Sequence, residues 1–431
     1  MAAYFRTFDY MKKFQCLGPD CEDTCCSGWK VNLFKKDYTK IKKKLDAAPT
    51  LAPYRKCLTR NPSSERCDDN YGALDFSENG QCGMMVDGWC LLHRDFGEKM
   101  LPTVCATFPR LIYERAAGWE VHGRLSCPEV ARLCLLAPVE CHFEDDDKTG
   151  LPEIYETNSW VKEPGGYFKD HLEMVSGSIR KLVWLNDFTA AEKSYFVLYL
   201  CSKLAPFYYM GVAADPMPRL ERTLTRMEEP AFLERVRENL TAASPSSAVR
   251  NLILAVANAR LQGDHYARYN ALCLSILKSY GAPESPLAQT GVLADESEMA
   301  MVWGRFLERR GLVLKLYGAR VERYYANFAM NYWSQALFVG NVELDTPAKK
   351  WLFYYAFTRF LFFSHPKVVE VAESQCSEEL AGPVLDAAIV EVVQIFMKTI
   401  DANLMMLNSF LAPMETLGLK NLTQLTGLLC L

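Results

Sequence analysis

The sequence predicts a mainly α protein in which a loop-rich, cysteine-rich N-terminal domain is followed by an irregular domain of many helices. Twelve of the 16 cysteines lie at or before Cys141, where glycine, proline and asparagine interrupt short segments. From about residue 165 onward, apolar residues recur at three- and four-residue spacing, which is typical of helices with one buried face. The chain has 431 residues, half of them apolar, so we expect two domains.

We place the domain boundaries where the composition changes. Residues 1–145 form the predicted cysteine-rich, metal-binding domain, and residues 165–431 form the helical domain. The acidic run from Glu144 to Asp147, together with the segment that follows it up to Pro152, is interpreted as a linker, with a solvated turn as the alternative. A subdivision of the helical domain is expected near 281–295, because glycine and prolines break the helical pattern there.

Few regular elements are expected in the N-terminal domain. The apolar run 29–34 has the length and composition of a strand. Residues 37–45 and 128–136 show helical spacing. Glycine and proline are frequent between these segments, so we expect loops to make up most of the domain.

The helical domain has clear helix starts. Thr189 and Glu192 have the spacing of a capping box ahead of a helix over 195–204. Proline is favoured in the first turn of a helix, because its missing N–H has no partner to lose there. Pro230 therefore predicts a helix over 231–240, and Pro347 predicts an aromatic helix that ends near Phe363.

Charge and composition exclude several classes of protein. The net charge of −4 provides no basic surface for phosphate groups, so a nucleic-acid partner is not expected. Residues 1–15 lack the continuous apolar stretch of a signal peptide, and we expect a cytoplasmic protein. In that reducing compartment a dense thiol cluster more often binds metal than forms disulfides.

The most apolar segments of the chain are expected to be buried helices. Residues 351–363 are interrupted by Arg359 and are too short to span a bilayer. Residues 383–400 are interrupted by Asp386 and Glu391. No membrane partner is therefore expected.

Cysteine spacing indicates a metal centre in the N-terminal domain. Four thiols fall within one eleven-residue stretch, and four more follow in separated segments between residues 82 and 127. Short, turn-rich loops of this kind can wrap around a metal. The eight candidate ligands are Cys16, Cys21, Cys25, Cys26, Cys82, Cys90, Cys105 and Cys127.

Ligand type alone does not select the metal. Thiolates suit zinc and iron–sulfur clusters, and four of them satisfy either zinc or a 4Fe-4S cluster. Adjacent Cys25 and Cys26 are awkward ligands for one tetrahedral zinc, because neighbouring side chains diverge in extended backbone. Proline often follows an iron–sulfur ligand, and Pro128 follows Cys127. Iron is therefore favoured, with zinc as the alternative.

The remaining cysteines and the neighbouring side chains have plainer interpretations. The four cysteines beyond residue 141 are expected in the core. His93 is either a ligand or a hydrogen-bond donor to one, and Trp29 and Arg110 are expected to pack around the site. Four further cysteines are either inert or ligands: Cys57, Cys67, Cys134 and Cys141.

The cysteine motifs resemble the flagellin lysine N-methylase (FliB) family, whose cysteine-rich part belongs to a broader group of zinc- or iron-chelating domains. The matching motifs lie between residues 14 and 129, and the general organisation matches over the whole length. The resemblance implies S-adenosylmethionine-dependent N-methylation of flagellin lysines, with an associated iron–sulfur cluster. The motifs are Cys16-x4-Cys21-x3-Cys25-Cys26-x2-Trp29, Cys90-Leu91-Leu92-His93, Phe108-Pro109-Arg110 and Ser126-Cys127-Pro128-Glu129.

The sequence contains no standard site for S-adenosylmethionine. No glycine-rich turn follows a strand and opens a helix, so the doubly wound methyltransferase fold is not expected. Radical S-adenosylmethionine enzymes use Cys-x3-Cys-x2-Cys, and here Cys21 and Cys25 are followed by Gly28 at the third position. No catalytic base and no oligomeric state are predicted.

Aromatic residues between 324 and 363 are expected mainly in the core, with a pocket for a sulfonium or a lysine stem as the alternative. The leading hypothesis is thus a flagellin-lysine methyltransferase. The alternative is a non-enzymatic zinc- or iron-binding module whose helical domain docks a partner.

Overall fold

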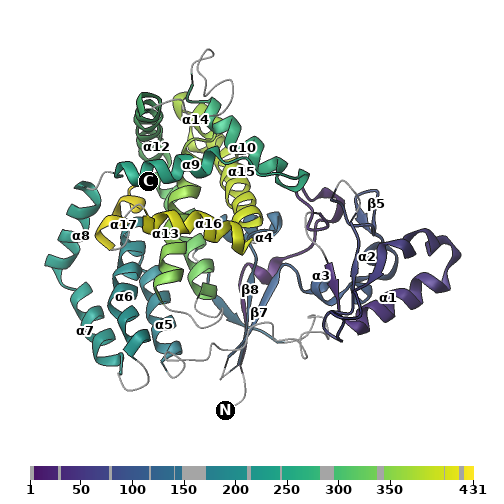
Figure 1. The fold of residues 1–431 in the computed structure, drawn as a ribbon. Coiled ribbons are helices and arrows are strands. Elements are labelled where there is room, and N and C mark those ends of the chain that lie inside the picture. The colour runs from purple at the N-terminus through teal and green to yellow at the C-terminus, as the bar shows by residue number, and fades with distance from the viewer. Residues whose placement is uncertain are drawn as a thin grey trace. The chain divides into compact units, whose positions relative to one another are not determined.

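The computed structural model describes residues 4–27, 31–76, 80–115, 118–139, 141–147, 171–210, 215–242, 245–281, 296–336, 344–401, 403–416 and 422–431. The chain divides into two compact units. Unit 1 comprises Met1–Val130, Phe143–Trp160 and Gln262–Ala267, and unit 2 comprises Ala131–His142, Val161–Leu261 and Arg268–Leu431. Helices predominate among the described residues, which confirms the predicted fold class (Figure 1). The metal-binding character of the N-terminal domain stays a prediction.

Unit 1 contains a four-stranded mixed sheet that the sequence pattern did not predict. Its strands are β1 (Tyr4–Phe8), β7 (Arg110–Arg115), β8 (Gly118–Gly123) and β9 (Phe143–Asp145), in the order β7-β8-β1-β9. Strand β1 runs parallel to β8 and antiparallel to β9. Each strand mixes charged and aromatic residues, so none of them shows the apolar alternation by which a strand is recognised.

Strand β9 corrects the predicted linker. Glu144 and Asp145 pair with Thr7 and Arg6 of β1 instead of leaving the domain. The acidic side chains are held by cations of the same unit, since Lys12 Nζ lies 2.9 Å from Glu144 Oε2. Residues 148–152, the rest of the predicted linker, lie outside the described residues, as do residues 282–295 of the expected subdivision.

A second, smaller sheet of unit 1 supports helix α1 (Lys35–Ala47). Its strands β2 (Val31–Leu33), β4 (Gly72–Leu74) and β3 (Leu58–Arg60) are antiparallel neighbours in that order. The helix buries Ile41 and Leu45 in the cluster that also contains Leu33 and Leu74. Strand β2 and helix α1 agree with the predicted strand 29–34, of which residues 31–34 are described, and with the predicted helix 37–45. The other elements of unit 1 are the hairpin β5 (Met85–Val86) and β6 (Trp89–Cys90) and the helices α2 (Leu91–Phe96) and α3 (Thr103–Thr107). Helix α4 (Pro128–Leu135) begins in unit 1 and continues into unit 2 from Ala131.

Gly72 allows strand β4 to approach its neighbours closely. A Cβ at this position would lie 2.4 Å from Thr59 O and 2.7 Å from Cδ2 of Tyr38. Because a backbone oxygen of a paired strand cannot move freely, Gly72→Ala is expected to lower the free energy of unfolding by about 1–3 kcal/mol. Chemical denaturation measures the change. Gly177→Ala, with no atom within 4 Å of the added Cβ, is the control, and an equally small effect of both changes would contradict this account.

Unit 2 is built from helices. Its predicted helix starts are confirmed, since the backbone N–H of Thr189 donates to Glu192 Oε2 at 2.8 Å and that of Glu192 to Thr189 Oγ1 at 3.2 Å. Pro230 occupies the first position of α8. The helices are α5 (Leu172–Val183), α6 (Ala190–Met210), α7 (Met217–Met227), α8 (Pro230–Ala242), α9 (Ser247–Asn258), α10 (Ala267–Lys278), α12 (Glu296–Ala336), α13 (Asp345–Phe363), α14 (Pro366–Glu373), α15 (Glu378–Phe396), α16 (Leu404–Thr416) and α17 (Leu422–Leu429).

Helix α13 forms the centre of the unit 2 core. Every residue from Trp351 to Phe363 is buried, so this part of the helix has no solvent-facing side. The Trp351 ring lies 5.3 Å from those of Phe328 and Tyr332, measured between centroids. The aromatic residues of this region therefore pack against one another, which agrees with the core interpretation rather than with a ligand pocket.

Helix α15 and the π-helical turn Met397–Asp401 that follows it form one apolar stretch, Glu378–Asp401. By length and composition alone this stretch could cross a membrane, but 61% of its most apolar window is buried inside the protein. Leu385, Ile389 and Val393 contribute to the core. The burial agrees with the expectation that residues 383–400 form a buried helix.

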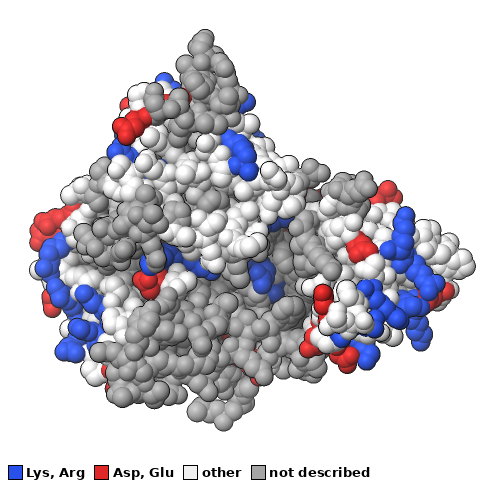
Figure 2. Space-filling model, viewed as in Figure 1, with Lys and Arg blue, Asp and Glu red and all other residues white. Residues whose placement is uncertain are grey.

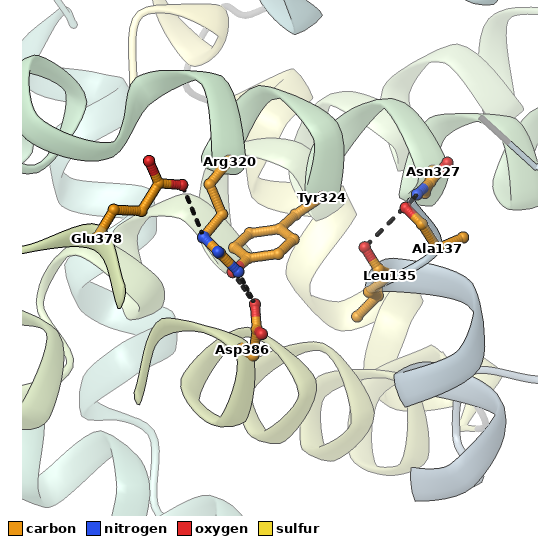
Figure 3. Close-up of polar contacts among 7 residues, drawn as sticks. All are labelled: Leu135, Ala137, Arg320, Tyr324, Asn327, Glu378 and Asp386. Carbon is orange, nitrogen blue, oxygen red and sulfur yellow. Dashed lines mark hydrogen bonds and ion pairs between the residues drawn. The ribbon is translucent and has the colours of Figure 1, made fainter. Parts of the chain in front are cut away.

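Polar side chains join α12 to its neighbours in unit 2 (Figure 3). Arg320 Nη1 lies 2.8 Å from Asp386 Oδ1 on α15, and Tyr324 donates its hydroxyl to the same oxygen. One turn further along α12, Asn327 Oδ1 accepts a hydrogen bond from the backbone N–H of Cys141 at 3.1 Å. The Nδ2 of the same side chain donates to Ala137 O at 3.3 Å. Asn327 therefore provides hydrogen-bond partners for backbone groups of the loop that follows α4.

Replacing Asn327 with alanine is expected to destabilise unit 2. The side chain is fully buried, so its removal takes away the hydrogen bonds that it makes with the N–H of Cys141 and the carbonyl of Ala137, at a place where water does not replace them. We expect a loss of about 2–3 kcal/mol in the free energy of unfolding. The matched change is Asn258→Ala, because Asn258 Oδ1 accepts no hydrogen bond. Equal stability of the two variants in denaturant titrations would show that these bonds contribute nothing.

Candidate functional site

Separated segments of unit 1 bring the predicted ligands together. Cys16, Cys21, Cys25 and Cys26 lie on one loop, which is joined to the next cysteine segment because the N–H of Cys82 donates to Cys26 O at 2.8 Å. The bridge between Ser27 and Gln81 continues this pairing. Cys90 ends the hairpin β5–β6, Cys105 lies in α3, and Cys127 immediately precedes α4.

Five thiols form a first group around the core of unit 1. Cys82 is buried in that core, and Cys26, Cys90 and Cys105 pack against the same apolar cluster. Burial, followed by the negative charges that Cys26, Cys90 and Cys82 would carry, raises the pKa of Cys105. A hydrogen bond with Cys26, followed by burial, raises the pKa of Cys25. These mutual effects place the five sulfurs within electrostatic range of one another.

Cys25 and Cys26 correct one detail of the sequence interpretation. They lie in a turn and not in extended backbone, and their side chains contact each other instead of diverging. Adjacent cysteines can therefore face the same site in this loop.

A second group contains Cys16, Cys21 and Cys127. Burial raises the pKa of Cys127 to about 12, and the charges of Cys21 and Cys16 act in the same direction. Cys16 also contributes to the raised pKa values of Cys25 and Cys90. Cys16 therefore interacts electrostatically with members of both groups, a division that the spacing of the cysteines did not indicate.

Backbone N–H groups point at four of the sulfurs. Met84 donates to Cys82, and His93 and Leu92 donate to Cys90. In the second group Asp23 donates to Cys21, while Val130 and Glu129 donate to Cys127. Each of these bonds lowers the pKa of its thiol and so favours the thiolate, which is the form that binds metal. These donors were missed by the sequence reasoning, because any residue type can provide a backbone N–H.

Two other cysteines donate a hydrogen bond through their thiol instead of accepting one. The thiol of Cys57 donates to Gly83 O at 3.5 Å, and that of Cys141 donates to Cys134 O at the same distance. A thiol that donates in this way is held in its protonated form. Cys134 and Cys141 are fully buried in unit 2, so we interpret both, together with Cys57, as structural.

The side chains that were expected to surround the site lie in different places. Trp29 lies outside the described residues. The guanidinium of Arg110 covers the Phe14 ring at 5.2 Å, and the contact of His93 with Cys90 is made by its backbone N–H. The sequence reasoning assigned no role to Trp89, whose ring lies only 2.9 Å from the position of a Cβ at Gly18. Trp89 thus covers the loop between Cys16 and Cys21.

Among the described residues, no three histidine, cysteine, aspartate or glutamate side chains are close enough together to hold one metal ion. The thiols therefore approach one another without forming a coordination shell, and the eight ligands stay predictions. The donor chemistry nevertheless fits a thiophilic metal. Buried neighbouring thiols cannot all ionise in the absence of a cation, whereas a bound metal deprotonates the thiols that coordinate it.

Unit 2 has a pocket of about 500 Å³ that includes residues of α6 and α12 in its lining. Lys193, Glu322 and Arg323 supply its charged groups, and the Glu322 carboxylate already accepts the backbone N–H of Ala190. Its volume is typical of small-molecule sites.

Comparisons with known proteins show that the chain is similar to lysine-N-methylases and to a flagellar biosynthetic protein. Lysine-N-methylase from Salmonella typhimurium is 30% identical over 135 residues, which are 30% of this chain and 32% of that protein, and the lysine-N-methylase of Salmonella choleraesuis gives the same values. Flagellar biosynthetic protein FliU from Salmonella muenchen is 30% identical over 132 residues, which are 30% of this chain and 75% of FliU. The match thus spans about a third of the two lysine-N-methylases. No family model and no solved structure matches the chain.

Proposed function

Because the chain belongs to the family of the lysine-N-methylases and FliU, we propose that it is a methyltransferase that N-methylates lysine side chains of flagellin. The observation that carries the proposal is the 30% identity to the lysine-N-methylases over 135 residues. The name of FliU supports a flagellar substrate. We further propose S-adenosylmethionine as the methyl donor and the cytoplasm as the compartment, where the 16 cysteines would stay reduced.

Methylation of lysine places two demands on the site. The amine nitrogen attacks the methyl carbon while the carbon–sulfur bond breaks, so both must be held in line. The lysine must also lose its proton, because an ammonium has no free electron pair. A desolvated pocket favours the neutral amine by lowering its pKa.

We propose that the cysteines of unit 1 hold a 4Fe-4S cluster, with zinc as the alternative. Cys26, Cys82, Cys90 and Cys105 are our first choice of ligands, because they pack against one apolar cluster. Four thiolates satisfy such a cluster, and the backbone N–H groups directed at Cys82 and Cys90 are of the kind that tune its potential. A bound cluster would tie the Cys16–Cys26 loop to the β5–β6 hairpin and α3.

A methyl-transfer assay tests the enzymatic proposal. Protein purified without oxygen is incubated with flagellin and S-adenosylmethionine that carries a labelled methyl group, and the lysines are recovered after hydrolysis. We expect label in methylated lysine. Flagellin whose lysines have been acetylated is the control and should stay unlabelled. If no metal state of the protein labels flagellin, the proposed activity is refuted.

A second candidate is a non-enzymatic metal-binding module whose helical part docks a partner. It is favoured by the match to FliU, which covers 75% of a protein named for flagellar biosynthesis and not for catalysis. A colourless, zinc-containing protein without methyl transfer would support this candidate.

A further inference from the structure

Helix α1 presents a lysine-rich outer face on unit 1. The helix carries six lysines and two aspartates, a net charge of +4 in a chain whose net charge is −4. Its inner side is buried at Tyr38, Ile41 and Leu45. Lys36 and Lys43 are seven residues apart, or about 10 Å along the axis, and helical periodicity places them opposite that side. Figure 2 shows Lys and Arg gathered over this end of unit 1.

The lysines on the flanks of α1 contact carboxylates or backbone carbonyls, whereas the contact of Lys36 on the outer face is with an aromatic ring, since its Nζ lies 5.7 Å from the centre of the Phe34 ring. Lys35 Nζ lies 3.0 Å from Asp68 Oδ1, and Lys42 pairs with Asp46. Lys40 donates to two backbone carbonyls and lies 3.5 Å from Asp37 Oδ1. Lys36 and Lys43 are exposed and have no carboxylate partner among the described residues. We call these two residues, with Lys44 beside them, the basic face.

The basic face is rigidly supported. Asp37 is buried and accepts the backbone N–H of Thr103 at 2.8 Å, which fixes α1 to α3. Lys44 lies over the Phe96 ring at 4.3 Å, so the α2 segment adjoins the same helix. A rigid set of charges loses little conformational freedom when a partner binds.

The positive charge of the basic face and its surroundings favour an acidic protein segment as the binding partner. An amphipathic helix binds a membrane through an exposed apolar side, and the apolar side of α1 is buried in the core. Single-stranded nucleic acid is bound by basic grooves with aromatic rings for base stacking, but the nearby Tyr71 ring faces the guanidinium groups of Arg60 and Arg66.

We propose that the basic face docks an acidic segment of the protein substrate. The inference rests on the proposed function in one respect, namely that the substrate is a protein. Complementary charges on the two binding surfaces raise the association rate and fix the orientation of the partner. The same unit holds the thiol groups, so a substrate bound here is held by the unit that carries the proposed metal centre.

Charge reversal at Lys36 and Lys43 tests the proposal. The variant K36E/K43E is compared with the control K181E/K315E, which changes two exposed lysines of α5 and α12 by the same total charge. Fluorescence anisotropy measures the binding of two probes, labelled flagellin and a labelled polyglutamate peptide. At low salt we expect K36E/K43E to weaken both interactions by about five- to ten-fold, and the control to change them by less than about two-fold. Binding to the unmodified protein should fall with added salt.

The binding results test separately the docking surface, the kind of partner and flagellin as the substrate. Equal binding of polyglutamate by K36E/K43E, by the control and by the unmodified protein would overturn the docking surface. Tighter binding of phosphatidylserine vesicles or duplex DNA through the same two lysines would overturn the choice of an acidic protein. If polyglutamate behaves as expected but flagellin neither binds nor becomes methylated, the basic face stands and flagellin as the substrate fails.

Discussion

From the proposed metal centre we expect that replacing Cys90 or Cys105 with serine removes most of the metal that co-purifies with the protein. Both sulfurs pack against the unit 1 core and lie within electrostatic range of Cys26. A serine hydroxyl has almost the same shape, but it is a neutral, hard donor that replaces a soft thiolate poorly. We expect the metal content to fall by about ten-fold or more, a larger loss than changes around the ligands usually cause. Elemental analysis after gel filtration measures the content.

Cysteines of the same unit provide matched controls for these substitutions. Cys67 is exposed, and Cys57 donates its S–H to a carbonyl. Serine at either position should leave the metal content unchanged. Metal binding is coupled to folding of the loops that supply the ligands, so the Cys90 and Cys105 variants should also melt at a lower temperature. Full metal content in both variants would refute the proposed ligand set.

Trp351→Ala is expected to cause the largest loss of stability in unit 2. The side chain is fully buried, and its Nε1 donates to Ser194 Oγ at 2.9 Å. Its ring also contacts those of Phe328 and Tyr332. Removing the ring opens a large cavity in a close-packed core, which costs about 3–5 kcal/mol. Urea titration followed by near-ultraviolet circular dichroism measures the change.

Two further substitutions are the controls for Trp351→Ala. Trp351→Phe keeps most of the apolar volume and loses the hydrogen bond to Ser194, so its cost should be clearly smaller. Leu380→Ala removes a side chain that is 70% exposed and should change stability by less than about 0.5 kcal/mol. If Trp351→Ala were no more costly than Leu380→Ala, helix α13 would not be the centre of the core.

Local signals in the sequence predicted the helical part of the fold. The capping box of Thr189 and Glu192 and the proline at position 230 act within one turn of the chain, so they can be read without the rest of the structure. The strands of the mixed sheet could not be predicted in this way. Residues of β1 pair with β8, more than a hundred positions later, and no local pattern specifies such a partner.

The candidate site was predictable in its composition but not in its arrangement. Spacing indicated which cysteines gather in unit 1. The division into two groups depends on which thiols the folded loops bring within electrostatic range of Cys90 and Cys127, which no spacing rule specifies. The distinction between ligand-type and structural thiols also depends on the structure. It follows from whether a sulfur accepts an N–H, as Cys82 does, or donates to a carbonyl, as Cys57 does.

The central claim is that thiolates from separated segments of unit 1 converge on one metal centre. X-ray absorption at the edge of the metal found in anaerobically purified protein tests it most directly, because the first coordination shell reports the donor atoms and their distance. The account predicts iron, or zinc as the alternative, surrounded by sulfur at about 2.3 Å. A shell of oxygen and nitrogen, or protein that contains no metal with its thiols free or paired as disulfides, would contradict it.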